Sequence, residues 1–218
     1  MNKKLRKNLI GIAKTRVRND LSHDFNHLYR VLKLAERIAK SENADLDVIV
    51  PAALFHDIIV YKGTSKAKYE VAESASLATK ILKNMKDYPQ SKIKQVVYAI
   101  SVCSYSKNIK PETLEAKVLQ DADLLEATGA ISIMRTFSSS IIMHIKSFYN
   151  PIDPFCKKRQ AEDRIYSLDL FFARLLVVNK RINTKAGRQI AKRRISFLYK
   201  FLNELNLELE ESDDRRKY

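Results

Sequence analysis

The chain has 218 residues, 45% of them hydrophobic and 30% charged, which is the composition of a globular protein of about one domain. The 40 Lys and Arg against 25 Asp and Glu give a formal net charge of +15. Only 4 Gly and 5 Pro leave few turns, which argues against a sandwich or barrel. No apolar run is long enough to cross a membrane, and the charged first residues do not resemble a secretion signal. Two cysteines are too few for a disulfide framework, so we expect a reduced, cytoplasmic protein.

The basic excess is uneven along the chain. Residues 151–200 hold 13 basic against 4 acidic side chains, whereas the stretch ELEESDD near the end is acidic. A cationic field favours polyanionic partners such as nucleotides or nucleic acid. Solvated helix faces explain the excess equally well, because the basic residues are spread through amphipathic segments rather than gathered in one block.

Apolar residues recur at spacings of three and four along most of the chain, which predicts an all-α fold. In chain order, the first predicted helices cover residues 25–39, 47–59 and 67–86. Two more start near Pro89 and Pro111. The segment 47–59 is apolar almost all round, so we expect it in the middle of the core.

The second half of the sequence continues the helical pattern. Residues 129–147 predict a helix interrupted at Ser138–Ser140, because three serines make a poor helix centre. Residues 147–157 hold two prolines beside aromatic residues and predict an ordered loop. Residues 160–182 and 185–210 predict two long helices. We expect one domain over the whole chain.

The strongest candidate for chemistry is the pair His56-Asp57, at the end of the most apolar predicted helix. An ionisable pair in such a place is costly unless it is paired or bound to a metal ion. His27 lies on the inner face of an earlier predicted helix. A later apolar helix with the sequence DADLLEA carries three acidic residues, Asp121, Asp123 and Glu126.

Each of these residues also has an ordinary structural explanation. A lone histidine on an apolar helix face is more often a hydrogen-bonded core residue, and a DxD pair is more often an exposed turn or a cap. The combination is what favours a site, because imidazole and carboxylate groups from three helices would form a mixed nitrogen and oxygen site. Such a site suits Mn²⁺, Fe²⁺, Zn²⁺, Co²⁺ or Mg²⁺ and leaves positions open for water and substrate.

The order His27, His56-Asp57, Asp123 resembles the pattern of the HD-domain metal-dependent phosphohydrolases. Three longer stretches are also similar to that family, namely DFNHLYRVLKLAERIA, PAALFHDI and LEAKVLQDADLLEATGAISIMRTF. The resemblance covers roughly residues 20–205 and is greatest to small bacterial and archaeal members related to nucleotide pyrophosphohydrolases. It implies a helical HD-type domain over residues 1–218, with a core at about 20–150 and a C-terminal helical extension at about 151–210.

The resemblance implies that His27, His56, Asp57 and Asp123 are the ligands of a divalent metal ion. It also selects Asp123 over Asp121, two positions that the residues alone leave equivalent. Asp121 would then orient a ligand or a helix.

His23 lies four residues before His27 on the same helical face and competes for its role if the helix begins earlier. We prefer His27, because it aligns with the first histidine of the family and lies farther inside the helix.

The chemistry of the family is the attack of a metal-activated water on a phosphoryl group, with cationic side chains stabilising the developing charge. Lys66 and Arg135 are our candidates for a catalytic role beside Asp57. Three residues are candidates for substrate binding: Lys62, Tyr105 (stacking on or bordering a base) and Lys107. Each basic residue taken singly is more often solvated than catalytic.

The sequence departs from the family pattern in three places. Many members have an acidic residue four positions after the HD histidine, where this chain has Val60; Glu70 or Glu73 could substitute for it. The segment VCSYS lacks a histidine that many members use for a second metal, which favours a mononuclear site. Leu124 stands where members often have Arg or Lys.

Two hypotheses of different class follow. The first is a metal-dependent phosphohydrolase of a nucleotide or similar small phosphate ester, releasing either phosphate or, from a nucleoside triphosphate, pyrophosphate. The second is a nucleotide- or nucleic-acid-binding HD module with little turnover, suggested by the charge of +15 and by Val60. Metal-dependent turnover would favour the hydrolase. Steeply salt-dependent binding without such turnover would favour the binding module. A homodimer is a further possibility, and we expect no membrane partner.

Overall fold

The computed structural model describes residues 1–17, 24–61, 65–104 and 109–211. Within these ranges the chain is helical, and its only bridge of β type pairs Ser147 with Tyr166. The prediction of an all-α fold is confirmed. Among the described helices, none is long and apolar enough to span a membrane.

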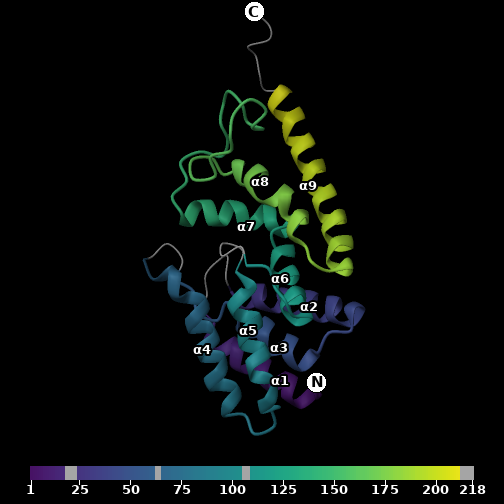
Figure 1. The fold of residues 1–218 in the computed structure, drawn as a ribbon. Helices are drawn as coiled ribbons and strands as arrows, with labels where there is room; N and C mark the ends of the chain where they lie inside the picture. The colour runs from purple at the N-terminus through teal and green to yellow at the C-terminus, as the bar shows by residue number, and fades with distance from the viewer. Residues whose placement is uncertain (18–23, 62–64, 105–108, 212–218) are drawn as a thin grey trace, which may run out of the picture.

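The helices gather in two layers, with α1 to α6 below and α7 to α9 above (Figure 1). The lower layer contains α1 (Lys3–Arg16), α2 (Phe25–Glu42), α3 (Leu46–Phe55), η1 (Ser65–Tyr69), α4 (Glu70–Lys83), η2 (Gln90–Lys92), α5 (Ile93–Cys103) and α6 (Leu114–Leu125). The upper layer contains α7 (Gly129–Ile142), α8 (Asp169–Ala173), η4 (Leu175–Arg181) and α9 (Lys185–Glu211).

Helix α3 lies in the centre of the lower layer, as its apolar sequence predicts, and every residue from Val48 to Phe55 is buried. Its second turn contains Pro51, which cannot donate a hydrogen bond to the carbonyl of Asp47. That carbonyl accepts a hydrogen bond from the Tyr88 hydroxyl at 2.9 Å instead. The helix ends at Phe55, earlier than predicted, so His56 and Asp57 stand at its C-terminal end.

Helix α6 is joined to the start of α9 by a buried carboxylate. Asp121 is fully buried and accepts hydrogen bonds from the backbone and side chain of both Asn183 and Thr184, at 2.6–2.9 Å. Gly187 packs against this carboxylate, and a Cβ there would lie 2.7 Å from an Asp121 oxygen. A larger residue would therefore separate α9 from α6.

A second hydrophobic cluster holds the upper layer together. It consists of buried residues from α8 and the residue before it, η4 and α9, namely Leu168, Phe171, Leu175, Leu198 and Leu202. The α9 helix also places Ala191 and Ile195 in the core of the lower layer. The two layers therefore share α9 as a common packing element.

Two helix predictions in the upper layer were wrong. Residues 160–182 do not form one long helix, because the buried carboxylate of Asp169 binds the Arg159 guanidinium at 2.5 and 2.7 Å and the Glu162 backbone N–H at 2.6 Å. These bonds hold the chain in turns before α8. Residues Ser138–Ser140 do not interrupt α7, since Ser138 and Ser140 bond to carbonyls four residues earlier, which keeps their hydroxyls inside the helical pattern.

Candidate metal centre

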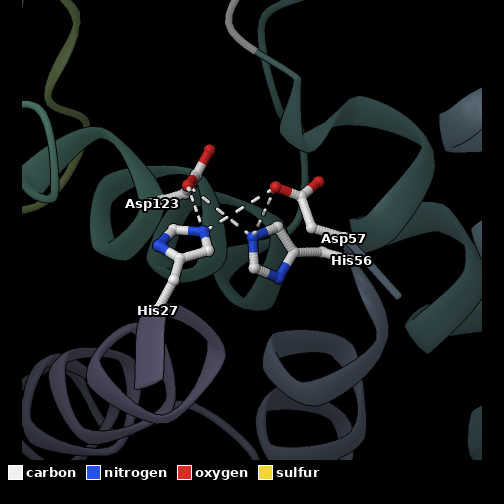
Figure 2. A group of neighbouring side chains, drawn as sticks. All are labelled: His27, His56, Asp57 and Asp123. Atoms are coloured by element: carbon white, nitrogen blue, oxygen red, sulfur yellow. Dashed lines mark ion pairs between the residues drawn. The ribbon is translucent and has the colours of Figure 1, made fainter. Parts of the chain in front are cut away.

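Four side chains from three separate segments of the sequence converge where α2, α3 and α6 meet (Figure 2). His27 comes from α2, His56 and Asp57 from the end of α3, and Asp123 from α6. One nitrogen or oxygen atom from each lies within 4.8 Å of the others. The Nε2 atoms of both histidines lie 3.6–3.8 Å from the nearest oxygens of Asp57 and Asp123.

These distances are too long for hydrogen bonds and short enough for the four groups to share one ion. The Nε2 atom of His56 is buried and makes no hydrogen bond, which is costly for a polar atom. The histidine side chains are almost fully buried, whereas Asp57 and Asp123 remain 33% and 23% exposed. The residues present therefore fit a divalent metal ion that is reached from the carboxylate side.

The other ring nitrogen of each histidine is held from behind. His56 Nδ1 lies 2.9 Å from the Ala53 carbonyl, which can only accept, so Nδ1 carries the proton. His27 Nδ1 lies 3.4 Å from a Glu126 carboxylate oxygen. Both contacts leave Nε2 as the atom that faces the centre, which is the arrangement that metal-binding histidines need.

Glu126 is a buried acid behind the centre, with 1% of its surface exposed. The same carboxylate oxygen that faces His27 accepts a hydrogen bond from Arg30 Nε at 2.8 Å and lies 3.9 Å from Arg135 Nη1. Burial raises the pKa of Glu126, but the hydrogen bonds from His27 and Arg30 outweigh it and lower that pKa. Glu126 is therefore an ionised carboxylate that joins His27 to two guanidinium groups.

The charge balance of the centre favours a bound cation. Burial lowers the pKa of His56, but the carboxylates of Asp57 and Asp123 raise it to about 9. Burial raises the pKa of Asp123, but the neighbouring His56 lowers it below its usual range. Two ionised carboxylates facing two imidazoles thus attract positive charge, which either a proton or a metal ion can supply.

The two alternatives for the acidic residue of α6 have different surroundings. The carboxylate of Asp121 is bound to Asn183 and Thr184, while that of Asp123 faces the two histidines. Asp121 therefore anchors α9 and does not orient a side chain of the centre. The competing His23 lies outside the described residues.

The predicted cationic and substrate-binding residues are placed unevenly. Arg135 lines a cavity next to Asp57 and Asp123. Lys66 is exposed in η1, with its Nζ 6.0 Å from the Tyr61 ring centroid, and is not part of that cavity wall. Three other candidates, Lys62, Tyr105 and Lys107, lie outside the described residues.

The acidic residues proposed to replace the missing acid at Val60 are both bonded to one tyrosine. The Tyr61 backbone N–H donates to Glu70, and the Tyr61 hydroxyl donates to Glu73 at 2.6 Å. Val60 itself is buried. Both carboxylates therefore accept hydrogen bonds from Tyr61, which attaches the segment after α3 to the start of α4.

Two residues near the centre were not found by sequence reasoning. Arg30 follows His27 by one helical turn, and this i,i+3 spacing was the available signal. Arg174 lines the cavity next to Asp57 from the segment between α8 and η4, and nothing in the sequence connects it to the centre.

Residues 24–128 match the HD domain family. That segment contains all four residues of the centre, so the centre lies within the part of the chain that matches the HD domain. The Bacillus subtilis (strain 168) protein YpgQ, which is uncharacterised, is 28% identical over 188 residues, covering 86% of this chain and 84% of YpgQ.

Solved structures agree with this assignment over nearly the whole chain. The crystal structure of Bacillus subtilis YpgQ in complex with ADP is similar with a TM-score of 0.72 and 26% identity, covering 94% of this chain and 95% of YpgQ. An HD-superfamily hydrolase from Bacillus thuringiensis is similar with a TM-score of 0.70 and 26% identity, covering 95% of this chain and 98% of that one. The likeness therefore extends well beyond residue 128.

Proposed function

We propose that this protein is a metal-dependent phosphohydrolase that acts on a nucleotide or a similar small phosphate ester. The observation that carries the proposal is the convergence of His27, His56, Asp57 and Asp123 around a buried His56 Nε2 that makes no hydrogen bond. These four residues would hold one divalent ion, Mn²⁺, Co²⁺, Mg²⁺, Zn²⁺ or Fe²⁺. When bound, such an ion supplies Lewis acidity and lowers the pKa of a water towards neutrality.

The remaining side chains would act on the charge and position of the substrate. Asp57 is the more exposed carboxylate of the centre and would take part in catalysis as well as in metal binding. Arg135 faces the same cavity and would stabilise negative charge on the phosphoryl oxygens. Glu126 would keep the Nδ1 proton on His27, so that Nε2 stays available.

Support for a nucleotide substrate comes from a relative. YpgQ has been crystallised with ADP, and its structure is similar to this chain over almost its full length. Lys62, Tyr105 and Lys107 remain our candidates for substrate binding, and Lys66 for a further cationic contact. Release of pyrophosphate from a nucleoside triphosphate is the reaction we favour, because the sequence resembles the pyrophosphohydrolase members most.

A nucleotide-binding HD module with little turnover is the second candidate. It is favoured by Val60, which stands where many members of the family have an acidic residue. A cytoplasmic location and a homodimer also remain predictions.

The test is a metal-by-substrate screen on protein stripped with chelator. Mn²⁺, Co²⁺, Mg²⁺ and Zn²⁺ are crossed with nucleoside mono-, di- and triphosphates, and both phosphate and pyrophosphate are measured. We expect His56→Asn to abolish turnover, while His144→Asn, which removes an exposed histidine at a φ of 54° that suits asparagine, leaves it unchanged. Tight metal binding with no turnover of any substrate would favour the binding module.

A further inference from the structure

A cavity of about 310 Å³ opens directly beside the candidate metal centre. Asp57 and Asp123 form part of its wall, so a ligand in this cavity lies next to the candidate metal centre. Most of its other lining residues come from α7, α8 and η4, beyond the segment 24–128 that matches the HD domain. The residues of the metal centre therefore come from the segment that matches the HD domain, while most of the other cavity residues come from the part of the chain that follows it.

One wall of the cavity carries hydroxyl groups. Ser132, Thr136 and Ser139 line it at spacings of four and three residues, which places them on one face of α7. Ser132 and Thr136 are each only 2% exposed. The Ser132 hydroxyl donates to the Gly129 carbonyl at 2.7 Å, so its oxygen is left as an acceptor.

A second wall is aliphatic. It is formed by Leu170 of α8 together with Leu175 and Val178 of η4, which are three residues apart and so lie on one side of a 3-10 helix. Leu175 and Val178 are 4% and 1% exposed and are anchored in the core. This wall offers an apolar surface to a flat or apolar group and no partner to a polar one.

Guanidinium groups complete the cavity. Arg135 lies beside Glu126, and Arg174 is 45% exposed and paired with Asp163 at 2.8 Å. A ligand that suits all of these features carries an anionic group next to the metal centre and an uncharged body with both an apolar face and polar atoms. A cavity of this size lies at the lower end of those that hold small ligands.

We infer that this cavity binds the nucleoside part of the substrate, and that the aliphatic wall within residues 170–178 contacts the nucleobase. The inference rests on the proposed function, since it places the phosphoryl group at the metal centre. A nucleobase presents an apolar ring face to Leu170, Leu175 and Val178 and hydrogen-bonding atoms at its edge. A sugar phosphate would bring hydroxyls against the aliphatic wall, where they lose water without gaining a partner.

Two adjacent serines offer a matched test. Ser139 lines the cavity, whereas Ser138 does not and bonds to the Met134 carbonyl. Ser139→Trp fills the cavity, and Ser138→Trp adds the same side chain beside it. Leu170→Ser changes the aliphatic wall without adding bulk, which keeps the test independent of any distortion caused by tryptophan.

The measurement is calorimetric binding of AMP and of ribose 5-phosphate to the full-length, Mn²⁺-loaded protein. We expect wild type and Ser138→Trp to bind AMP at least about tenfold more tightly than ribose 5-phosphate. Ser139→Trp should lose that preference, and Leu170→Ser should reduce it by about fivefold, as the loss of one leucine contact predicts. Affinity for Mn²⁺ should stay within about twofold in all four proteins, since no substituted residue belongs to the centre.

Three outcomes would overturn the inference: equal binding of AMP and ribose 5-phosphate by wild type, no binding of either, or an unchanged preference in both Ser139→Trp and Leu170→Ser. The result is separate from the turnover screen. Selective AMP binding without turnover would refute the proposed hydrolase function and support the nucleoside site. Turnover of phosphate esters without a preference for AMP over ribose 5-phosphate would refute only the nucleoside site.

Discussion

Replacing Glu126 by glutamine tests whether the buried carboxylate behind His27 tunes the metal centre. The substitution keeps the size of the side chain and removes its charge. In the structure this carboxylate lies 3.4 Å from His27 Nδ1, 2.8 Å from Arg30 Nε and 3.9 Å from Arg135 Nη1. The glutamine amide can still accept a hydrogen bond, but it no longer offsets the two guanidinium charges or favours a proton on His27 Nδ1.

The expected loss is tenfold to a hundredfold in Mn²⁺ affinity, or about 1.4–2.7 kcal/mol, which is the usual effect of removing a group that orients a metal-binding histidine. Protein stability should fall separately by about 1.5–3 kcal/mol, because the hydrogen bond from Arg30 loses its charged acceptor. The two effects are distinguishable, since stability is measured in excess chelator and affinity by titration of the folded protein.

Asp121→Asn is the matched control, because Asp121 is a fully buried carboxylate on the same helix that holds α9 rather than His27. Calorimetric titration with Mn²⁺ and urea unfolding should show reduced stability for both variants and reduced metal affinity for Glu126→Gln alone. An affinity within twofold of wild type in Glu126→Gln, or an equal loss in Asp121→Asn, would refute the reasoning.

Further predictions concern the metal, the cavity and the upper layer. Adding Mn²⁺ at a hundred times its dissociation constant to chelator-stripped protein should stabilise it by about 2.7 kcal/mol in urea unfolding, and no stabilisation would contradict metal binding by the folded state. Arg135→Gln should lower kcat/KM by about 10²-fold with Mn²⁺ affinity retained, while Arg164→Gln, outside the cavity, should change neither quantity. Asp169→Asn should cost about 1.5–3 kcal/mol at pH 7. Burial raises the pKa of Asp169 but Arg159 lowers it overall, so this stabilisation is present above the unfolded pKa of about 3.9 and disappears as the pH falls through the folded pKa. A difference between wild type and Asp169→Asn that stayed constant down to pH 2 would contradict that assignment.

The helical character of the chain was predictable because apolar spacing reports which side of a helix is buried. Helix α9 was expected over 185–210 and is found over Lys185–Glu211. The same pattern misled over 160–182, where apolar residues face a core although the chain forms turns, the short helix α8 and the 3-10 helix η4 in place of one long helix. The Asp169 carboxylate prevents a continuous helix by accepting hydrogen bonds from the Arg159 guanidinium and the Glu162 backbone N–H, and such bonds leave no periodic trace in the sequence.

The sequence by itself determined the residue types at the centre, because a buried His56-Asp57 pair needs a partner and the resemblance to HD proteins names His27 and Asp123. The tertiary structure supplies the physical difference between the two carboxylates of α6, which the residues alone leave equivalent. Asp121 and Asp123 lie two residues apart, about 200° around the helix axis, so only the packing of α2 on one side and α9 on the other separates their roles. The tertiary structure also formed the cavity. Most of its lining comes from α7 and residues 170–178, which lie beside Asp57 and Asp123 only when the two layers pack.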